Sequence, residues 1–169
     1  KKLKNDFLIT KVNLQLSRNK KFNLEYKSLK DALSQYNIYE IDLKLINKII
    51  REIRNSKLPD YTSLGNAGSF FKNPEIDEIT FNKLFRDYPD ISFFKVENKY
   101  KISAGWLIEK CGFKGKKDGN VGCYEKQALV IVNYGNATGN EILNFSNKIK
   151  NAVYEKFNIN LELEVNIIQ

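Results

Sequence analysis

The chain has 169 residues, of which 42% are hydrophobic and 12% aromatic, and it carries a formal net charge of +8. This length is enough for one well-buried core, and the positive charge favours anionic partners such as nucleic acid, acidic lipid or a phosphorylated small molecule. Histidine is absent. This excludes Ser-His-Asp and Cys-His nucleophiles and histidine-ligated zinc, so any catalysis must use Ser, Lys, Tyr, Arg or carboxylates.

The two thiols and the chain start narrow the class of protein further. Cys111 and Cys123 lack CxxC spacing, so we expect reduced, inert cysteines and no metal site, with a structural disulfide as the alternative. No apolar run approaches the roughly 20 residues of a membrane span, and the lysine-rich start has no secretory core. We therefore expect a cytoplasmic protein without a membrane partner. Because position 1 is Lys rather than Met, we expect a fragment of a longer protein.

Periodicity predicts three elements in the first half of the chain. Apolar residues alternate with polar ones over residues 8–16, which is typical of a half-buried strand. Residues 40–57 show helical spacing, and the Leu-Pro at 58–59 is expected to end that helix. A shorter helix is expected over residues 77–87.

The second half predicts a single α+β domain with a mixed or antiparallel sheet covered by helices. Residues 91–102 read as a hairpin and residues 103–112 as a short helix that ends at a glycine. Residues 128–133 are a continuous apolar run, as expected for a central strand, and alternation over residues 161–167 predicts a last strand. One helical stripe lies between them: Ile142, Phe145, Ile149, Val153 and Phe157.

A serine in a glycine-rich segment is the first candidate site. The Gly-x-x-Gly-Ser run of residues 65–69, followed by Lys72 and Asn73, offers backbone N–H groups, a hydroxyl, an ammonium and an amide to an anionic ligand. The spacing matches neither a P-loop nor a dinucleotide fingerprint. A plain glycine turn leading into a strand is the alternative. Phe70 and Phe71 are expected in the core rather than as stacking platforms.

Other polar residues have both a functional and a structural interpretation. The lysines of residues 111–120 could attract phosphate, or could simply be solvated on glycine turns. Glu164 could be catalytic, or could lie on an exposed strand face. Arg54 and Lys57 suit a helix C-terminus through the macrodipole alone.

Five segments in one order carry a family resemblance. They are KLPD at 57–60, GNAGSFFKNP at 65–74, AGWLIEKCGFKG at 104–115, QALVIVN at 127–133 and LELEV at 161–165. Over essentially its whole length the chain resembles the C-terminal half of the UDP-N-acetylenolpyruvoylglucosamine reductase family, also called UDP-N-acetylmuramate dehydrogenase or MurB. These are flavoenzymes of bacterial peptidoglycan precursor synthesis.

The resemblance implies a two-step hydride transfer. In that family NADPH reduces a bound FAD, and the flavin passes hydride to UDP-N-acetylglucosamine enolpyruvate to give UDP-N-acetylmuramate. The cofactor supplies the redox chemistry while the protein positions and protonates the substrate. By position in the motifs, Ser69 would be the general acid, and Glu164 would help to stabilise or protonate the enol intermediate.

The resemblance also implies a set of substrate contacts. Lys57, Asn73 and Gln127 match positions that hold the UDP-sugar, and Arg54 lies at a matching basic position. Tyr26 resembles the tyrosine of a loop that closes over the diphosphate in one subclass. Basic and tyrosine side chains around a diphosphate would account for the net positive charge of the chain, so no nucleic-acid partner is needed to explain it.

Several departures from the family pattern are also visible. The FAD-binding half and an arginine that polarises the substrate carboxylate would lie before residue 1. Tyr124 stands where the family often has histidine, Leu163 replaces a proline, and Asn166 replaces a basic residue. We therefore expect residues 1–169 to be the substrate-binding portion of the reductase, monomeric, with its own N-terminal FAD domain as partner. Alone, the chain is expected to bind no flavin and to be inactive.

A binding module is the alternative from another class. The net charge, together with Phe70, Phe71, Phe93 and Phe94, would suit a non-catalytic domain that stacks nucleic-acid bases or binds another polyanion.

Overall fold

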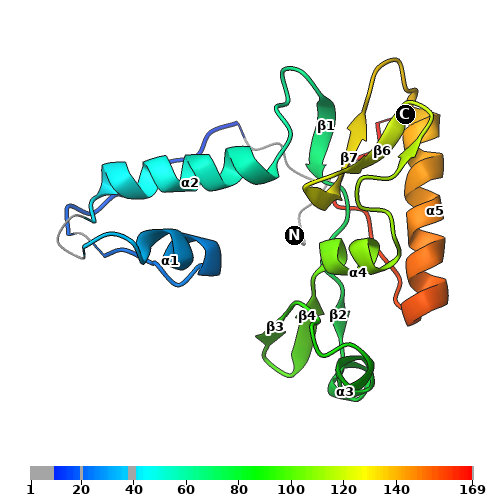
Figure 1. The fold of residues 1–169 in the computed structure, drawn as a ribbon, viewed down its shortest axis with the longest axis horizontal. Coiled ribbons are helices and arrows are strands. Elements are labelled where there is room, and N and C mark those ends of the chain that lie inside the picture. Colours follow the sequence, from blue (N-terminus) through cyan, green and yellow to red (C-terminus); the bar gives the residue numbers. More distant parts are fainter. Residues whose placement is uncertain (1–9, 20, 38–40, 169) are drawn as a thin grey trace. The chain divides into compact units, whose positions relative to one another are not determined.

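Helices and short antiparallel strands alternate along the chain in the computed structural model, which describes residues 10–19, 21–37 and 41–168 (Figure 1). The chain divides into two units, residues 1–49 and residues 50–169. Within the described residues every strand pairing is antiparallel. The predicted α+β class is confirmed, and both sheets lie in the second unit.

The first unit contains α1 (Lys27–Leu33) and the start of α2 (Leu43–Lys57). Leu29 and Leu33 of α1 are buried. The Asp42 carboxylate accepts the backbone N–H of Leu45 at 2.7 Å, which satisfies one of the free N–H groups at the start of α2. The helix ends directly before the Leu-Pro pair, as predicted, because a residue that precedes proline is disfavoured in the helical region.

The strand predicted over residues 8–16 is wrong for the part that the structure describes. Residues 10–17 form no strand, and Val12, Leu14 and Leu16 are 69%, 78% and 87% exposed. Leu8 lies outside the described residues. Alternation specifies a strand only where a partner strand takes up its backbone hydrogen bonds and a core takes up its apolar face. Neither is present for this segment among the described residues.

A four-stranded sheet forms the centre of the second unit, in the order β1-β7-β6-β5. Its strands are β1 (Gly65–Ser69), β5 (Lys117–Asp118), β6 (Val121–Tyr124) and β7 (Gln127–Asn133). β7 pairs on both sides, and Val130 and Val132 are almost completely buried. The prediction of a central strand from the apolar run is therefore confirmed.

Two helices cover this sheet and complete the core (Figure 1). Thr138 and Glu141 form a capping box at the start of α5 (Gly139–Phe157), which explains why the helix begins there. Its buried positions include the predicted stripe residues Phe145, Ile149, Val153 and Phe157. The shorter α4 (Ala104–Lys110) is capped by the Ser103 hydroxyl and, as predicted, is followed by a left-handed Gly112.

A second, three-stranded sheet is packed under one helix. Its elements are β2 (Glu75–Ile76), α3 (Glu78–Asp87), β3 (Phe93–Val96) and β4 (Lys99–Ile102). The rings of Phe81 on α3 and Tyr100 on β4 stack with their centroids 3.8 Å apart. The predicted hairpin is confirmed, with Glu97 at the turn in the left-handed region (φ 50°).

The last predicted strand is reduced to a single bridge. Leu163 pairs with Phe71, and the described residues after Glu164 belong to no strand. Leu161 is 2% exposed, whereas Ile167 is 48% exposed, so burial of the alternating face fades along the segment. The predicted strand over residues 161–167 is wrong in extent because only its first part meets a partner.

Both cysteines are free, as predicted, and Cys123 is buried. No helix in the described part of the chain has the length and apolar character needed to cross a bilayer.

Candidate functional site

Ser69 is the last residue of β1 and its side chain is exposed. Gly65 pairs with Asn133 of β7 as part of the strand, and it is not in the left-handed region. Gly68 has φ +72°, a left-handed conformation that glycine adopts without steric cost. The segment is therefore a strand with one sharp irregularity immediately before the serine, rather than a turn that leads into a strand.

The residues after Ser69 join the C-terminal segment of the chain. The backbone N–H of Lys72 donates to the carbonyl of Glu162 at 2.9 Å, and the backbone N–H of Glu164 donates to the carbonyl of Phe70 at 2.9 Å. These bonds flank the bridge between Phe71 and Leu163. The structure thus brings Ser69 and Glu164, 95 positions apart in sequence, onto adjacent backbone segments.

An exposed ion pair spans this junction. The Lys72 ammonium lies 2.7 Å from the Glu162 carboxylate. The hydrogen bond and charge of Glu162 raise the pKa of Lys72, and the charge of Glu164 adds to the effect. In turn, Lys72 lowers the pKa of Glu162. Lys72 therefore provides positive charge beside both carboxylates of the LELEV segment.

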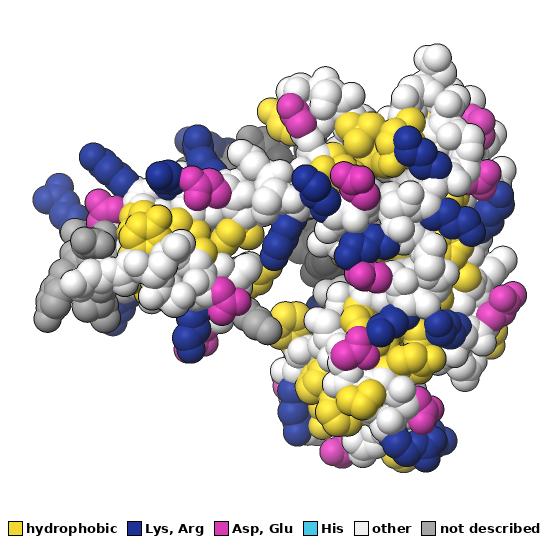
Figure 2. Space-filling model, in the orientation of Figure 1, with side chains coloured by type: hydrophobic (Ala, Val, Ile, Leu, Met, Phe, Trp, Pro, Cys, Tyr) yellow, Lys and Arg dark blue, Asp and Glu magenta, His cyan; other side chains and the backbone are white. Residues whose placement is uncertain are grey.

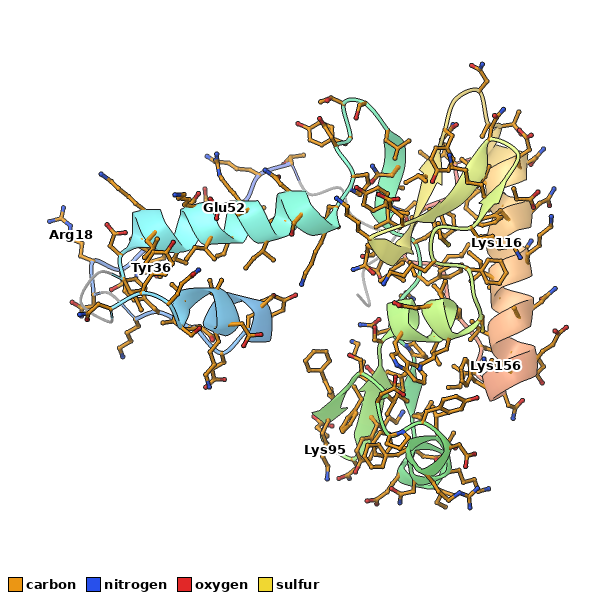
Figure 3. The ribbon with its side chains drawn as sticks, viewed as in Figure 1. Arg18, Tyr36, Glu52, Lys95, Lys116 and Lys156 are labelled. Atoms are coloured by element: carbon orange, nitrogen blue, oxygen red, sulfur yellow. The ribbon has the colours of Figure 1, made fainter. Side chains whose placement is uncertain are left out.

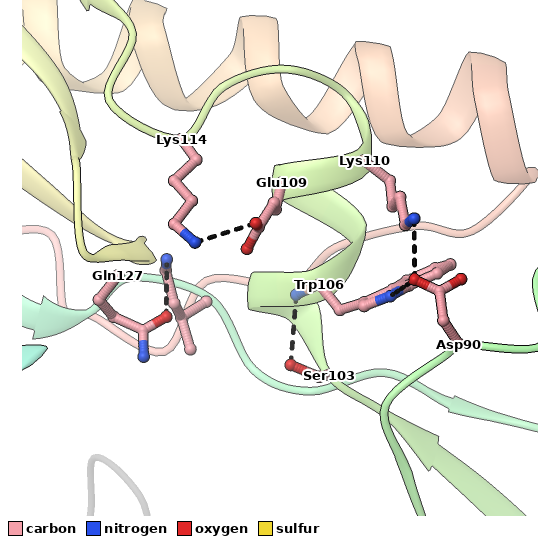
Figure 4. A network of polar contacts seen from close by, with 8 residues as sticks. Asp90, Ser103, Trp106, Glu109, Lys110, Lys114 and Gln127 are labelled. Carbon is pink, nitrogen blue, oxygen red and sulfur yellow. Dashed lines mark hydrogen bonds and ion pairs between the residues drawn. The ribbon is translucent and has the colours of Figure 1, made fainter.

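Two predicted substrate ligands meet at the start of α4. The Asn73 side-chain oxygen accepts the backbone N–H of Ala104 at 2.9 Å. The Gln127 side-chain oxygen accepts the backbone N–H of Leu129 at 3.4 Å (Figure 4), and a Cβ built on Gly105 would lie 3.1 Å from that oxygen. Each side-chain oxygen accepts a backbone N–H, which leaves the NH₂ group as the donor that could face a ligand.

A pocket of about 660 Å³ opens beside the serine strand. Arg54 lines it together with Asn66 and Gly68 of β1, and its floor includes Val130, the residue paired with Ser69. Within the second unit, Arg54 and β1 therefore share one cavity, although Ser69 itself does not line it. The volume is within the range of small-molecule sites.

Lys57 and Tyr26 are the two remaining predicted substrate ligands. Lys57 is the last residue of α2, one turn after Arg54, and its side chain is exposed. Tyr26 is the N-cap of α1 in the first unit, and its side chain is 65% exposed.

The lysines of residues 111–120 have local partners. Lys114 pairs with Glu109 at 2.9 Å (Figure 4). The ammonium groups of Lys116 and Lys117 lie over the rings of Phe113 and Tyr134 at 4.7 and 3.8 Å, and Lys116 is labelled in Figure 3. Basic and acidic side chains are interspersed on the visible face rather than gathered in one stripe (Figure 2). These contacts favour the interpretation of this loop as solvated glycine turns rather than as a phosphate site.

Two of the four aromatic residues considered for base stacking are buried. Phe70 and Phe71 are 5% and 1% exposed and belong to the core, as expected. Phe93 and Phe94 are exposed, on β3 of the small sheet. Two of the four rings that the polyanion alternative required are thus unavailable to a ligand.

Three of the residues that line the pocket beside β1 were not singled out from the sequence. Asn66, Asp60 and Tyr61 line the pocket but carried no prediction. The Asp60 carboxylate accepts both the backbone N–H and the hydroxyl of Thr62, which lowers the pKa of Asp60 and holds the loop before β1. An Asn or Asp two residues before a glycine or threonine is a local signal for such a loop.

Comparison with known proteins identifies relatives over nearly the whole chain. The family model "UDP-N-acetylenolpyruvoylglucosamine reductase, C-terminal domain" matches residues 59–168. The protein named UDP-N-acetylenolpyruvoylglucosamine reductase from Flavobacterium johnsoniae is 47% identical over 98% of this chain and 50% of its own length. Proteins of the same name from Porphyromonas gingivalis and Pseudomonas aeruginosa are 44% and 39% identical, over 96% and 95% of this chain and 48% of their lengths. The chain spans about half the length of these curated relatives.

Proposed function

Because the chain belongs to the UDP-N-acetylenolpyruvoylglucosamine reductase family, we propose that residues 1–169 are the substrate-binding and proton-donating portion of such a reductase. The reaction is conversion of UDP-N-acetylglucosamine enolpyruvate to UDP-N-acetylmuramate in peptidoglycan precursor synthesis, in the cytoplasm and as a monomer. The observation that carries the proposal is the pairing of residues 70–72 with residues 162–164, which joins the segment directly after Ser69 to the segment that carries Glu164.

The chemistry of an enolpyruvyl group explains why two such residues are needed. Its double bond is conjugated with a carboxylate, so a hydride added to the terminal methylene leaves negative charge on the α-carbon and the carboxylate. The Ser69 hydroxyl then gives its proton to the α-carbon, and Glu164 stabilises or protonates the same centre. The exposed position of both side chains allows a substrate to approach them. Positive charge from Lys72 next to Glu164 helps to balance the substrate carboxylate.

Flavin and NADPH supply the hydride in this scheme. The chain carries no dinucleotide fingerprint, so we assign flavin binding mainly to the half of such a reductase that lies outside this sequence. The residues described here bind and orient the nucleotide sugar and move the proton. That other half is the proposed partner of this chain.

The nucleotide sugar has anionic groups that match the basic side chains near the serine. Arg54 in the pocket and Lys57 one turn later are proposed to bind the diphosphate, with the amides of Asn73 and Gln127 as further donors. Tyr26 of the first unit is proposed to close over the diphosphate.

Separate measurement of the two half-reactions tests the proposal. In the full-length flavoprotein, Ser69→Ala should slow flavin reoxidation by the enolpyruvyl sugar by roughly 10²- to 10⁴-fold, the usual contribution of a general acid, and leave flavin reduction by NADPH unchanged. Ser92→Ala, at an exposed serine beside the small sheet, is the control. Wild-type reoxidation in Ser69→Ala would exclude Ser69 as the acid.

The substrate contacts need their own readout. Lys57→Ala should raise the KM for the enolpyruvyl sugar by roughly tenfold, with little change in kcat, because it removes binding that ground and transition states share. Lys95→Ala is a matched control, since that lysine lies over Tyr100 on the small sheet. An equal KM effect in both variants would point to general charge rather than to a specific contact.

A further inference from the structure

The bulge in β1 controls how Ser69 is presented. Asn66 pairs with Val132 and Ser69 pairs with Val130, so three residue steps on β1 lie opposite two steps on β7. One extra residue is therefore inserted directly before the serine. Because side chains alternate across a strand, a slip of one residue would turn every following side chain to the opposite face. Without the bulge, the serine and the buried phenylalanines after it could not keep their present faces.

Two features hold the extra residue in place. Gly68 adopts φ +72°, and a Cβ built on it would meet nothing within 4 Å. Glycine is thus required there by backbone conformation and not by lack of space. The second feature is the side chain of Asn66, whose oxygen accepts the backbone N–H of Gly68 at 3.0 Å. Its NH₂ group donates to the carbonyl of Leu64 at 2.9 Å.

Asn66 thus bridges both sides of the irregularity. Its acceptor fixes the residue that precedes Ser69, and its donor fixes the residue that precedes Gly65. Regular pairing resumes immediately afterwards, where the backbone N–H of Phe70 donates to the carbonyl of Leu129 at 2.9 Å. Of the side chains of this size, only an amide supplies both the acceptor and the donor, since Asp lacks the donor and Leu lacks both.

We infer that Asn66 is a positioning residue for the proton donor: it holds the β1 bulge in the shape that presents the Ser69 hydroxyl to the substrate. The inference rests on the proposed function, because it requires Ser69 to be the acid. Asn66 lines the same pocket as Arg54, yet both of its amide groups are bonded to backbone. We therefore assign it to the geometry of the serine and not to affinity for the nucleotide sugar.

A double-mutant cycle in the full-length flavoprotein tests this role. Asn66→Ala should slow flavin reoxidation by the enolpyruvyl sugar by roughly 10- to 100-fold, the cost of a displaced catalytic group. The KM for that sugar and the rate of flavin reduction by NADPH should stay near wild type. In a Ser69→Ala background the same substitution should cost nothing further, since a residue that acts only through Ser69 has nothing left to position.

A conservative variant and a matched asparagine complete the design. Asn66→Asp keeps the acceptor for Gly68 and should recover part of the lost rate. Asn133 of β7 makes similar bonds to a different loop, accepting from the N–H groups of Gly135 and Ala137 at 2.9 and 3.1 Å. Asn133→Ala should therefore lower Tm without a selective effect on reoxidation.

The possible results separate this inference from the proposed function. Wild-type reoxidation in Ser69→Ala overturns the proposed function itself. A slow Ser69→Ala combined with wild-type rates in both Asn66 variants overturns the inference alone. Equal slowing by Asn66→Ala with and without the serine hydroxyl also overturns it. If neither Asn66 variant folds while Asn133→Ala does, the role of Asn66 is structural and the inference fails.

Discussion

The carbonyl of Phe70 accepts the backbone N–H of Glu164 at 2.9 Å, and this bond is one of two backbone hydrogen bonds among the described residues that join the segments carrying the proposed proton donors. Phe70 follows Ser69 directly, so the serine lies one residue before this hydrogen bond. Glu164 is itself the donor residue of the bond. Burial of Phe70 and Phe71 anchors the serine side in the core. The serine is therefore attached directly to the hydrophobic core of the second unit.

The ion pair at this joint predicts a specific pH dependence. Lys72 holds the pKa of Glu162 below its usual value, so ionisation of Glu162 stabilises the fold above the unfolded-state pKa of about 4.3. That contribution disappears as the pH falls through the lower, folded-state pKa. Lys72→Gln should raise the pKa of Glu162 in an NMR titration and reduce the loss of stability between neutral pH and about pH 3.

Lys101→Gln is the control for this titration, since Lys101 lies 3.7 Å from Glu75 in the other sheet. It should leave the Glu162 titration curve unchanged. An unshifted curve in Lys72→Gln would contradict the assigned cause.

Close backbone contact at Gly122 predicts a destabilising alanine substitution. A Cβ there would lie 2.6 Å from the carbonyl oxygen of Lys116 and 3.0 Å from the ring of Tyr134. β5 would have to move away from β6, and overpacking of this kind costs about 1–3 kcal/mol. Gly139→Ala, at a position with nothing within 4 Å, should be neutral or slightly stabilising. Equal Tm values for the two variants would show that the strands can separate freely.

The two thiols should differ in reactivity. Burial raises the pKa of Cys123 to about 12, and it also raises the pKa of the half-buried Cys111, where the charge of Lys156 opposes the effect. The thiolate is the nucleophile, so iodoacetamide near pH 8 should modify Cys111 slowly and Cys123 only after denaturation. Mass spectrometry of timed samples measures both rates. Alkylation of native Cys123 as fast as that of Cys111 would mean that its strand opens readily.

The capping box of α5 predicts that removal of the Thr138 hydroxyl lowers the stability of the protein. Thr138 accepts the backbone N–H of Glu141 at 3.3 Å. Thr138→Ala should destabilise the protein by about 1 kcal/mol in urea unfolding, because the first turn loses its cap. Thr138→Ser keeps the hydroxyl and should retain most of the stability. Equal losses in both variants would attribute the effect to the threonine methyl group instead.

Local signals in the sequence were sufficient to predict most helices and the central strand. The helices around Ile49, Phe81, Leu107 and Ile149 follow from apolar spacing together with caps and breakers within a few residues of each end. The apolar run of residues 128–133 could hardly lie anywhere except in a sheet interior. These features depend on residues close by in the sequence, so they can be predicted without knowledge of the tertiary structure.

Strand pairing could not be read in the same way. Residues 10–16 and 161–167 alternate equally well, yet the first segment forms no strand and the second forms one bridge. A strand exists only through hydrogen bonds to a distant segment, and alternation does not say whether that segment is present. The bulge at Ser69 was hidden for the same reason, since it is defined by register against β7.

The site shows both kinds of information. Residue types and motif order singled out Ser69, Glu164, Asn73 and Gln127, because their chemistry and family resemblance are properties of the chain itself. Their arrangement came from folding: the bridge at Phe71 joins the segment of the serine to that of the glutamate, and the two amides both lie near the start of α4. The role inferred for Asn66 became visible only there, because hydrogen bonds to Leu64 and Gly68 acquire meaning once a second strand sets the register.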